Sequence, residues 1–113
     1  MEELRNFIGG QWTDTAFDRR SELIDPSTGE VFASAPVSSE TEVAAAFASA
    51  AEAFPGWRDC TPAERSLALL RIADAIETHA DELVKAESQN TGKPIALTLS
   101  EEIPPMVDQI RFF

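Results

Sequence analysis

Cysteine and histidine are almost missing from this 113-residue chain, which contains one of each. The single cysteine, Cys60, cannot form a disulfide within the chain, and one cysteine leaves no cysteine-rich zinc site. Cys60 and His79 are separated by nineteen residues, most of them in one expected helix. At the helical rise per residue this spacing is about 28 Å. The two side chains cannot form a nucleophile–base pair, and we expect no catalytic residue in the chain.

Basic residues are also few, nine against twenty acidic ones, which gives a net charge of -11. This balance repels nucleic-acid phosphates and anionic lipid surfaces. No apolar run approaches the roughly 20 residues that cross a bilayer, and the acidic start at Glu2 and Glu3 is unlike a signal peptide. We therefore expect no nucleic-acid or membrane partner, and a cytoplasmic location.

The five glycines do not form a phosphate-binding pattern. None belongs to a G-x-G-x-x-G turn, and the phrase Thr91-Gly92-Lys93-Pro94 lacks the upstream glycine of a P-loop. We interpret this phrase as a helix stop, because glycine and a following proline commonly end helices. The chain alone is expected to contain no dinucleotide-binding residues.

Two turn patterns occupy the first 37 residues. Gly9-Gly10 lies between apolar residues and can supply the positive φ angles of a two-residue hairpin turn. Residues 25–29, Asp-Pro-Ser-Thr-Gly, match a type I turn followed by a left-handed residue. The sequence therefore predicts two β-hairpins in residues 1–37, the second pairing with the first.

Residues 38–113 have helical periodicity in three regions. Ser39 and Glu42 have the spacing of a capping box, and Pro55-Gly56 is the expected end of that helix. Its apolar stripe has helical spacing and consists of Val43, Phe47, Ala50 and Phe54. We expect this stripe, and the apolar stripe of the next predicted helix, to be covered in a larger protein; in this chain alone both should be exposed and favour self-association or loose packing.

A second capping box, Thr61 with Glu64, starts the longest predicted helix, which continues to about residue 88 before an Asn90-Thr91-Gly92 stop. The third helical region begins near Pro94, restarts or kinks at Pro104-Pro105, and has no stop signal before Phe113. The prediction is an α+β fold in a single domain, residues 1–113, that forms the front end of a larger protein.

Four phrases resemble one enzyme family in their order and spacing. They are Asn6-Phe7-Ile8-Gly9-Gly10-Gln11-Trp12, Asp25-Pro26-Ser27-Thr28-Gly29-Glu30-Val31, residues 87–94 and Glu101-Glu102-Ile103-Pro104 running into Arg111-Phe112-Phe113. The chain resembles the N-terminal part of an NAD-dependent aldehyde dehydrogenase. The last phrase most resembles the bacterial gamma-aminobutyraldehyde dehydrogenase branch.

The resemblance implies that the chain is the N-terminal part of an α/β coenzyme-binding domain. In that family the reactive cysteine, the assisting glutamate, the dinucleotide turn and the oligomerisation domain lie outside this region, so the chain alone would be inactive. The complete protein would use NAD to oxidise a small-molecule aldehyde such as 4-aminobutanal, and would be a homodimer or homotetramer. A betaine-aldehyde or succinate-semialdehyde dehydrogenase is the alternative within the family. A non-catalytic helical interaction module is the alternative outside it.

The resemblance also implies a site for a sodium or potassium ion. In plant amino-aldehyde dehydrogenases such an ion binds positions that match the main-chain carbonyl of Ile24 and the side chain of Asn90. Hard cations prefer oxygen ligands. Asn90 is neutral where those relatives have an aspartate, which weakens the attraction. The alternative is that Asn90 is a left-handed helix C-cap.

Glu101 and Glu102 match, within one residue of register, acidic positions at the substrate-channel mouth of amino-aldehyde relatives. A carboxylate there would attract a protonated amine. The alternative interpretation is that both residues only complement the positive end of a helix. The sequence does not choose between the two glutamates.

Overall fold

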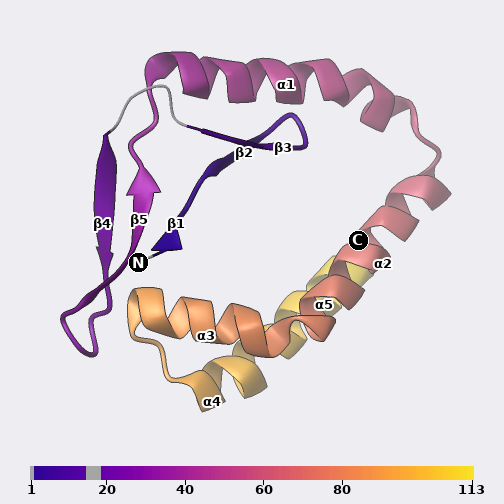
Figure 1. Ribbon diagram of the computed structural model, residues 1–113. Helices are drawn as coiled ribbons and strands as arrows, with labels where there is room; N and C mark the ends of the chain where they lie inside the picture. Colours follow the sequence, from indigo (N-terminus) through magenta and orange to yellow (C-terminus); the bar gives the residue numbers. More distant parts are fainter. Residues whose placement is uncertain (1, 15–18) are drawn as a thin grey trace. The chain divides into compact units, whose positions relative to one another are not determined.

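The computed structural model describes residues 2–14 and 19–113, which form an α+β fold, as predicted (Figure 1). These residues divide into two compact units. The first comprises the described residues up to Asp25 together with Gly29–Asp59, and the second comprises Pro26–Thr28 and Cys60–Phe113. The first long helix therefore belongs to the same compact unit as the strands.

The first predicted hairpin is confirmed. Strands β2 (Asn6–Ile8) and β3 (Gln11–Thr13) pair in antiparallel fashion around Gly9 and Gly10. Both glycines have positive φ angles, 62° and 77°, which side-chain-bearing residues rarely adopt. A Cβ atom on Gly9 would lie 3.4 Å from the Ser49 hydroxyl oxygen, so the turn also passes close to the following helix.

The second hairpin is confirmed, but its predicted partner is wrong. Strands β4 (Arg20–Ile24) and β5 (Val31–Pro36) are antiparallel neighbours in a three-stranded sheet. The third strand is β1 (Glu2–Glu3), which pairs in parallel with β5 and leaves β2 and β3 as a separate two-stranded sheet. The edge of β5 that faces away from β4 is occupied by β1, so it is not open to the first hairpin.

Helix α1 (Glu40–Asp59) starts at the predicted capping box, in which the Ser39 amide donates to Glu42 Oε2 over 2.7 Å. Its predicted end is wrong, because the helix runs through Pro55 and Gly56 for three further residues. Gly56 has no positive φ angle, and in the last turn the Arg58 guanidinium lies over the Phe54 ring, 6.0 Å from its centroid. The apolar stripe is exposed, as predicted for the chain alone: no residue of α1 is buried and Phe47 is 75% exposed.

The longest predicted helix is in fact two helices, α2 (Pro62–Thr78) and α3 (Ala80–Thr91). The Thr61–Glu64 capping box and the stop at Gly92, whose φ is 79°, are both confirmed. Between the helices His79 leaves the helical conformation with φ -103° and ψ 16°. The preceding Thr78 hydroxyl donates to the Asp74 carbonyl over 2.8 Å, a bond that competes with regular helix geometry.

The third helical region contains a short helix α4 (Ile95–Leu97), a π-helical turn η1 (Thr98–Glu102) and helix α5 (Ile103–Phe112). The restart expected at the prolines is confirmed, because Pro104 and Pro105 lie in the first turn of α5, where missing donors cost little. Figure 1 shows α5 running alongside α2.

The apolar core of the second unit lies where these helices meet. It consists of Ala73, Val84, Ile103 and Val107, with Ile76, Ala80 and Ile110 packed against them. At the surface, Arg111 on α5 donates to Asp74 over 2.8 Å and to Glu77 over 2.6 Å on α2. The break at His79 thus lets α2, α3 and α5 share one core. The expectation that the second predicted helix also exposes its apolar stripe is wrong, because Ala73 and Val84 are buried in this core.

Candidate functional site

A cluster of three charged side chains in the second unit is centred on Lys93, directly after the stop of α3. The Lys93 ammonium lies 2.9 Å from Glu102 Oε2 on the π-helical turn and 3.2 Å from Glu87 Oε1 on α3. These two carboxylates, Glu102 first, raise the pKa of Lys93 above its ordinary value of 10.5. Lys93 therefore stays protonated and links the end of α3 to the turn before α5.

An open cavity of about 440 Å³ adjoins this cluster. Its wall is mainly apolar and is formed by Ile76, Leu83, Val84, Thr98, Ile103 and Met106, with Glu87, Lys93 and Glu102 also lining it. The cavity thus combines an apolar surface with a group of charges in which the single cation is already paired.

The two candidate substrate glutamates both lie in the π-helical turn η1, but they have different partners. Its wider hydrogen bond runs from the Ile103 amide to the Thr98 carbonyl, and the buried Thr98 hydroxyl donates to the Pro94 carbonyl over 2.9 Å. Such turns occur frequently at functional sites. Glu102 is paired with Lys93, whereas Glu101 is exposed and makes no hydrogen bond or ion pair within the described part of the chain. Glu101 is consequently the carboxylate of this turn that is available to a ligand.

The two residues of the expected cation site belong to different units. Ile24 is the last residue of β4 in the first unit, and Asn90 lies in the last turn of α3 in the second. The alternative interpretation of Asn90 as a left-handed C-cap is wrong, because Gly92 takes that conformation and no other residue type among those described has a positive φ angle. The cation site itself stays a prediction.

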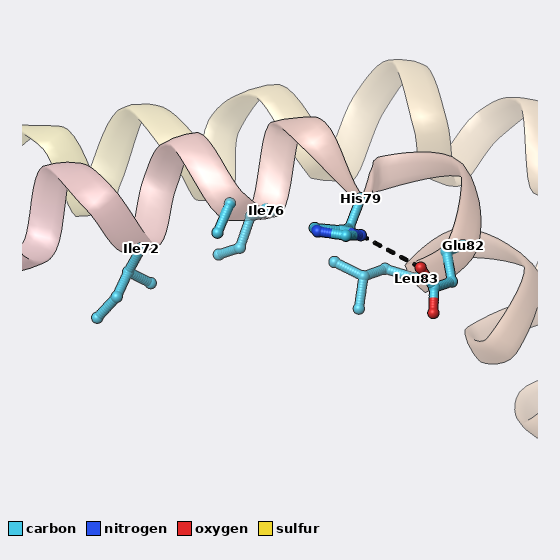
Figure 2. A pocket seen from close by; sticks show the side chains of 6 residues that line it. Ile72, Ile76, His79, Glu82 and Leu83 are labelled. Atoms are coloured by element: carbon cyan, nitrogen blue, oxygen red, sulfur yellow. Dashed lines mark hydrogen bonds and ion pairs between the residues drawn. The ribbon is translucent and has the colours of Figure 1, made fainter.

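A second, shallower hollow lies at the junction of α2 and α3. Figure 2 shows Ile76 of α2 and Leu83 of α3 near His79, with Ile72 further along α2; the His79 Nδ1 atom is 3.2 Å from Glu82 Oε2. An imidazole next to a carboxylate can serve as a base, but no nucleophile lines this hollow. Cys60 precedes the other end of α2, about 25 Å away along a seventeen-residue helix. The expectation that Cys60 and His79 do not pair is confirmed.

Two kinds of feature, a metal-binding group and a membrane-spanning helix, are absent from the described residues. In residues 2–14 and 19–113, no three histidine, cysteine or acidic side chains are grouped so that they could hold a metal ion. The same described stretches contain no helix with both the length and the apolar composition needed to cross a membrane.

Comparison with known proteins identifies the family. The model of the aldehyde dehydrogenase family matches residues 12–113, which is most of the chain. The chain belongs to the aldehyde dehydrogenase family. The 2-aminomuconic semialdehyde dehydrogenase of Mus musculus is 44% identical to it over 110 residues, which make up 97% of this chain and 22% of the mouse protein. A probable aldehyde dehydrogenase of Mycobacterium tuberculosis is 40% identical over 109 residues, 96% of this chain and 22% of its own length.

Solved aldehyde dehydrogenases share the fold. The NAD+ complex of the Bacillus cereus enzyme matches 98% of this chain and 23% of its own, with a TM-score of 0.91 and 32% identity. The Bartonella henselae aldehyde dehydrogenase matches the same share of the chain with a TM-score of 0.92 and 28% identity. The chain thus spans about a fifth of the length of these aldehyde dehydrogenases. The gamma-aminobutyraldehyde branch is a finer assignment than these matches support.

The sequence patterns of this aldehyde dehydrogenase region do not predict the ion pairs of Lys93, which distinguish Glu102 from Glu101. The sequence places Lys93 only beside a helix stop, and its carboxylate partners lie six residues before it and nine residues after it. Neither spacing is a helical repeat, so periodicity gave no signal. A lysine placed next to a stop between two acidic segments is the only sequence feature that could have suggested the cluster.

Proposed function

We propose that this chain is the N-terminal part of the coenzyme-binding domain of an NAD-dependent aldehyde dehydrogenase, which oxidises a small-molecule aldehyde to its acid. The observation that carries the proposal is the likeness, over 98% of the chain, to an aldehyde dehydrogenase solved with NAD+. In this proposal the reactive groups come from the rest of the complete protein. The chain contributes scaffold and one charged edge of the substrate path.

The proposed substrate is an aldehyde that carries an amino group, with 4-aminobutanal as the first choice. Two observations support this choice. Relatives 44% and 41% identical to the chain are named for 2-aminomuconic semialdehyde, which has an amino substituent and also a carboxylate, so these names support the amino group but not a positive charge. Glu101 is exposed and has no partner among the described residues, so its charge is available to attract a protonated amine.

A second candidate is oxidation of an apolar aldehyde. The long-chain-aldehyde dehydrogenase of an Acinetobacter species is 36% identical to the chain over 112 residues. An apolar substrate would gain nothing from Glu101, whereas betaine aldehyde would be attracted and the anion of succinic semialdehyde would be repelled. The charge of the aldehyde that the complete protein oxidises most efficiently therefore distinguishes an amino-aldehyde substrate from an apolar one.

The test is NADH formation by the complete protein with 4-aminobutanal, betaine aldehyde, succinic semialdehyde, 2-aminomuconic semialdehyde and butanal. Glu101→Gln should raise the KM for 4-aminobutanal severalfold and leave kcat for butanal close to that of the unaltered protein. Asp108→Asn removes the same charge from an exposed position on α5 and serves as the matched control. A preference for butanal over every charged aldehyde would support the apolar candidate. Failure to reduce NAD with any aldehyde would contradict the proposed function and favour a non-catalytic interaction module.

We also propose that the Ile24 carbonyl and Asn90 contribute to a sodium or potassium site. Asn90→Asp restores a full negative charge, so it should lower the cation concentration that gives half-maximal thermal stabilisation of the complete protein. An unchanged cation dependence would contradict the site.

We further propose a cytoplasmic homodimer or homotetramer, and sedimentation of the complete protein as a monomer would contradict that assembly.

A further inference from the structure

We propose that Lys93 is a specificity-determining residue that acts through Glu102: it cancels one of the two carboxylate charges of the π-helical turn and so limits how strongly the site favours cationic aldehydes. The inference rests on the proposed function, because it needs the turn to border the path of an aldehyde. It concerns this chain's own residues and the chemical class of substrate, namely aldehydes that differ in charge.

The position of Lys93 is fixed from both sides along the chain. Gly92 before it is in the left-handed conformation that ends α3, and Pro94 after it is the N-cap of α4. The backbone at Lys93 is thus held at the corner between two helices. From this corner the ammonium lies within 3.2 Å of carboxylates on both α3 and the turn.

The pairing is asymmetric between the two glutamates of the turn. Glu102 is engaged by Lys93 at 2.9 Å, while its sequence neighbour Glu101 is exposed and without a partner in the described part of the chain. In a regular α-helix the direction of these side chains would be set by the 3.6-residue period, but the π-helical turn changes it locally. Removing Lys93 would therefore free a second carboxylate beside the first.

The sign of the effect follows from the charges of the cluster. Glu87, Lys93, Glu101 and Glu102 together have a net charge of -2. Lys93→Gln makes it -3, which should lower the KM for 4-aminobutanal and raise the KM for succinic semialdehyde, each by about three- to tenfold. Glu102→Gln makes it -1 and should shift both KM values in the opposite directions. The double substitution restores -2 and should return both KM values toward those of the unaltered protein.

The experiment is this double-mutant cycle in the complete protein, with KM and kcat measured for the cationic, the anionic and an uncharged aldehyde of equal length. Opposite shifts for the two charged aldehydes, relative to the uncharged one, are a readout that mere loosening of the fold would not produce. The shifts should also shrink as salt is raised, because exposed charges are screened. Lys93→Arg keeps the charge and should retain the KM values of the unaltered protein.

The matched control is Lys85→Gln, which removes the only other lysine of the chain. Lys85 is exposed on α3, two positions before Glu87 and so on nearly the opposite side of the helix. Its loss should leave the ratio of the two charged-substrate KM values unchanged.

Two results would overturn the inference while the proposed function stands. One is active Lys93→Gln protein whose charged and uncharged substrates change together, and the other is a shift of equal size in Lys85→Gln. If Lys93→Gln does not fold, the Glu102→Gln variant alone tests the inference, because its predicted KM shifts have the opposite sign. An unaltered protein that oxidises no aldehyde would overturn the proposed function and this inference with it.

Discussion

Each of the two units of the chain is stabilised internally by different interactions. The second unit has an apolar core in which Ala73, Val84 and Val107 are almost completely buried. In the first unit the buried residues are small, Ala33 and Ser34, and the order comes from strand pairing and from Arg20, which donates to the Ser34 hydroxyl and carbonyl. The difference shows that helices α2, α3 and α5 pack against one another, whereas α1 presents its apolar stripe to the outside.

The largest expected effect of a single substitution is in the second unit. Ile103 is 8% exposed and contacts the core of α2, α3 and α5, so Ile103→Ala should cost about 3 kcal/mol of unfolding free energy. Ile72 on α2 is 50% exposed, and Ile72→Ala should cost about 1 kcal/mol or less. Urea unfolding followed by helical circular dichroism measures both. Equal losses would mean that the helices do not share a specific core.

Glycine substitutions should change stability with opposite signs in the two units. Gly92→Ala puts a Cβ atom at a φ of 79° and 3.2 Å from Pro26 Cγ, which should cost about 1–2 kcal/mol. Gly56→Ala fills open space inside α1 and should stabilise that helix by about 0.5–1 kcal/mol. Thermal melts of the two variants, each against the unaltered chain, give the comparison. A stabilising Gly92→Ala would contradict the left-handed helix stop.

The stability of the first unit should depend on the buried hydroxyl of Ser34. Ser34→Ala removes the acceptor for the Arg20 Nε donor, 2.8 Å away, and should cost about 1 kcal/mol. Hydrogen exchange of the β4 and β5 amides would report the loss, with Ser21→Ala on the exposed part of β4 as the control. No change in exchange would show that strand pairing alone holds this sheet.

Much of this fold was predictable because its signals are local. Gly9-Gly10, the two capping boxes and Gly92 each act on neighbouring backbone groups, and each has its predicted role. The errors have two physical origins. The pairing of β1 with β5 joins residues thirty-one positions apart, which no local pattern reports. The continuation of α1 beyond Pro55 has no signal in the sequence, and the break at His79 follows a Thr78 hydroxyl bond to a helix carbonyl that the periodicity does not report.

The candidate site was only partly predictable for the same reason. Glu101 and Glu102 are adjacent and chemically identical, so the sequence gives them equal weight. What distinguishes them is Lys93, which pairs with Glu102 at the end of the π-helical turn, nine residues further along the chain. Nothing in the helical period of residues 94–113 signals that extra residue in the turn.

The smallest expected effect is the pH dependence of the α2–α5 contact. Hydrogen bonds from Arg111 lower the pKa of Glu77 below its ordinary value of 4.5. A depressed carboxylate pKa adds stability that is present above the unfolded-state value and is lost as the pH falls through the folded-state value. The second unit should therefore lose stability as the pH falls below 4.5 and through the lowered folded-state pKa of Glu77. Arg111→Met should flatten that slope in unfolding experiments, and an equally steep slope would contradict the contact.

The central claim is that the complete protein oxidises aldehydes with NAD and favours those that carry a positive charge. Its most direct test is the ratio of kcat/KM for 4-aminobutanal to that for butanal, measured by NADH formation at increasing salt. The account predicts a ratio above one that falls as salt screens Glu101. A ratio that does not change with salt would contradict the charge-based choice of substrate, and no NADH with either aldehyde would contradict the function itself.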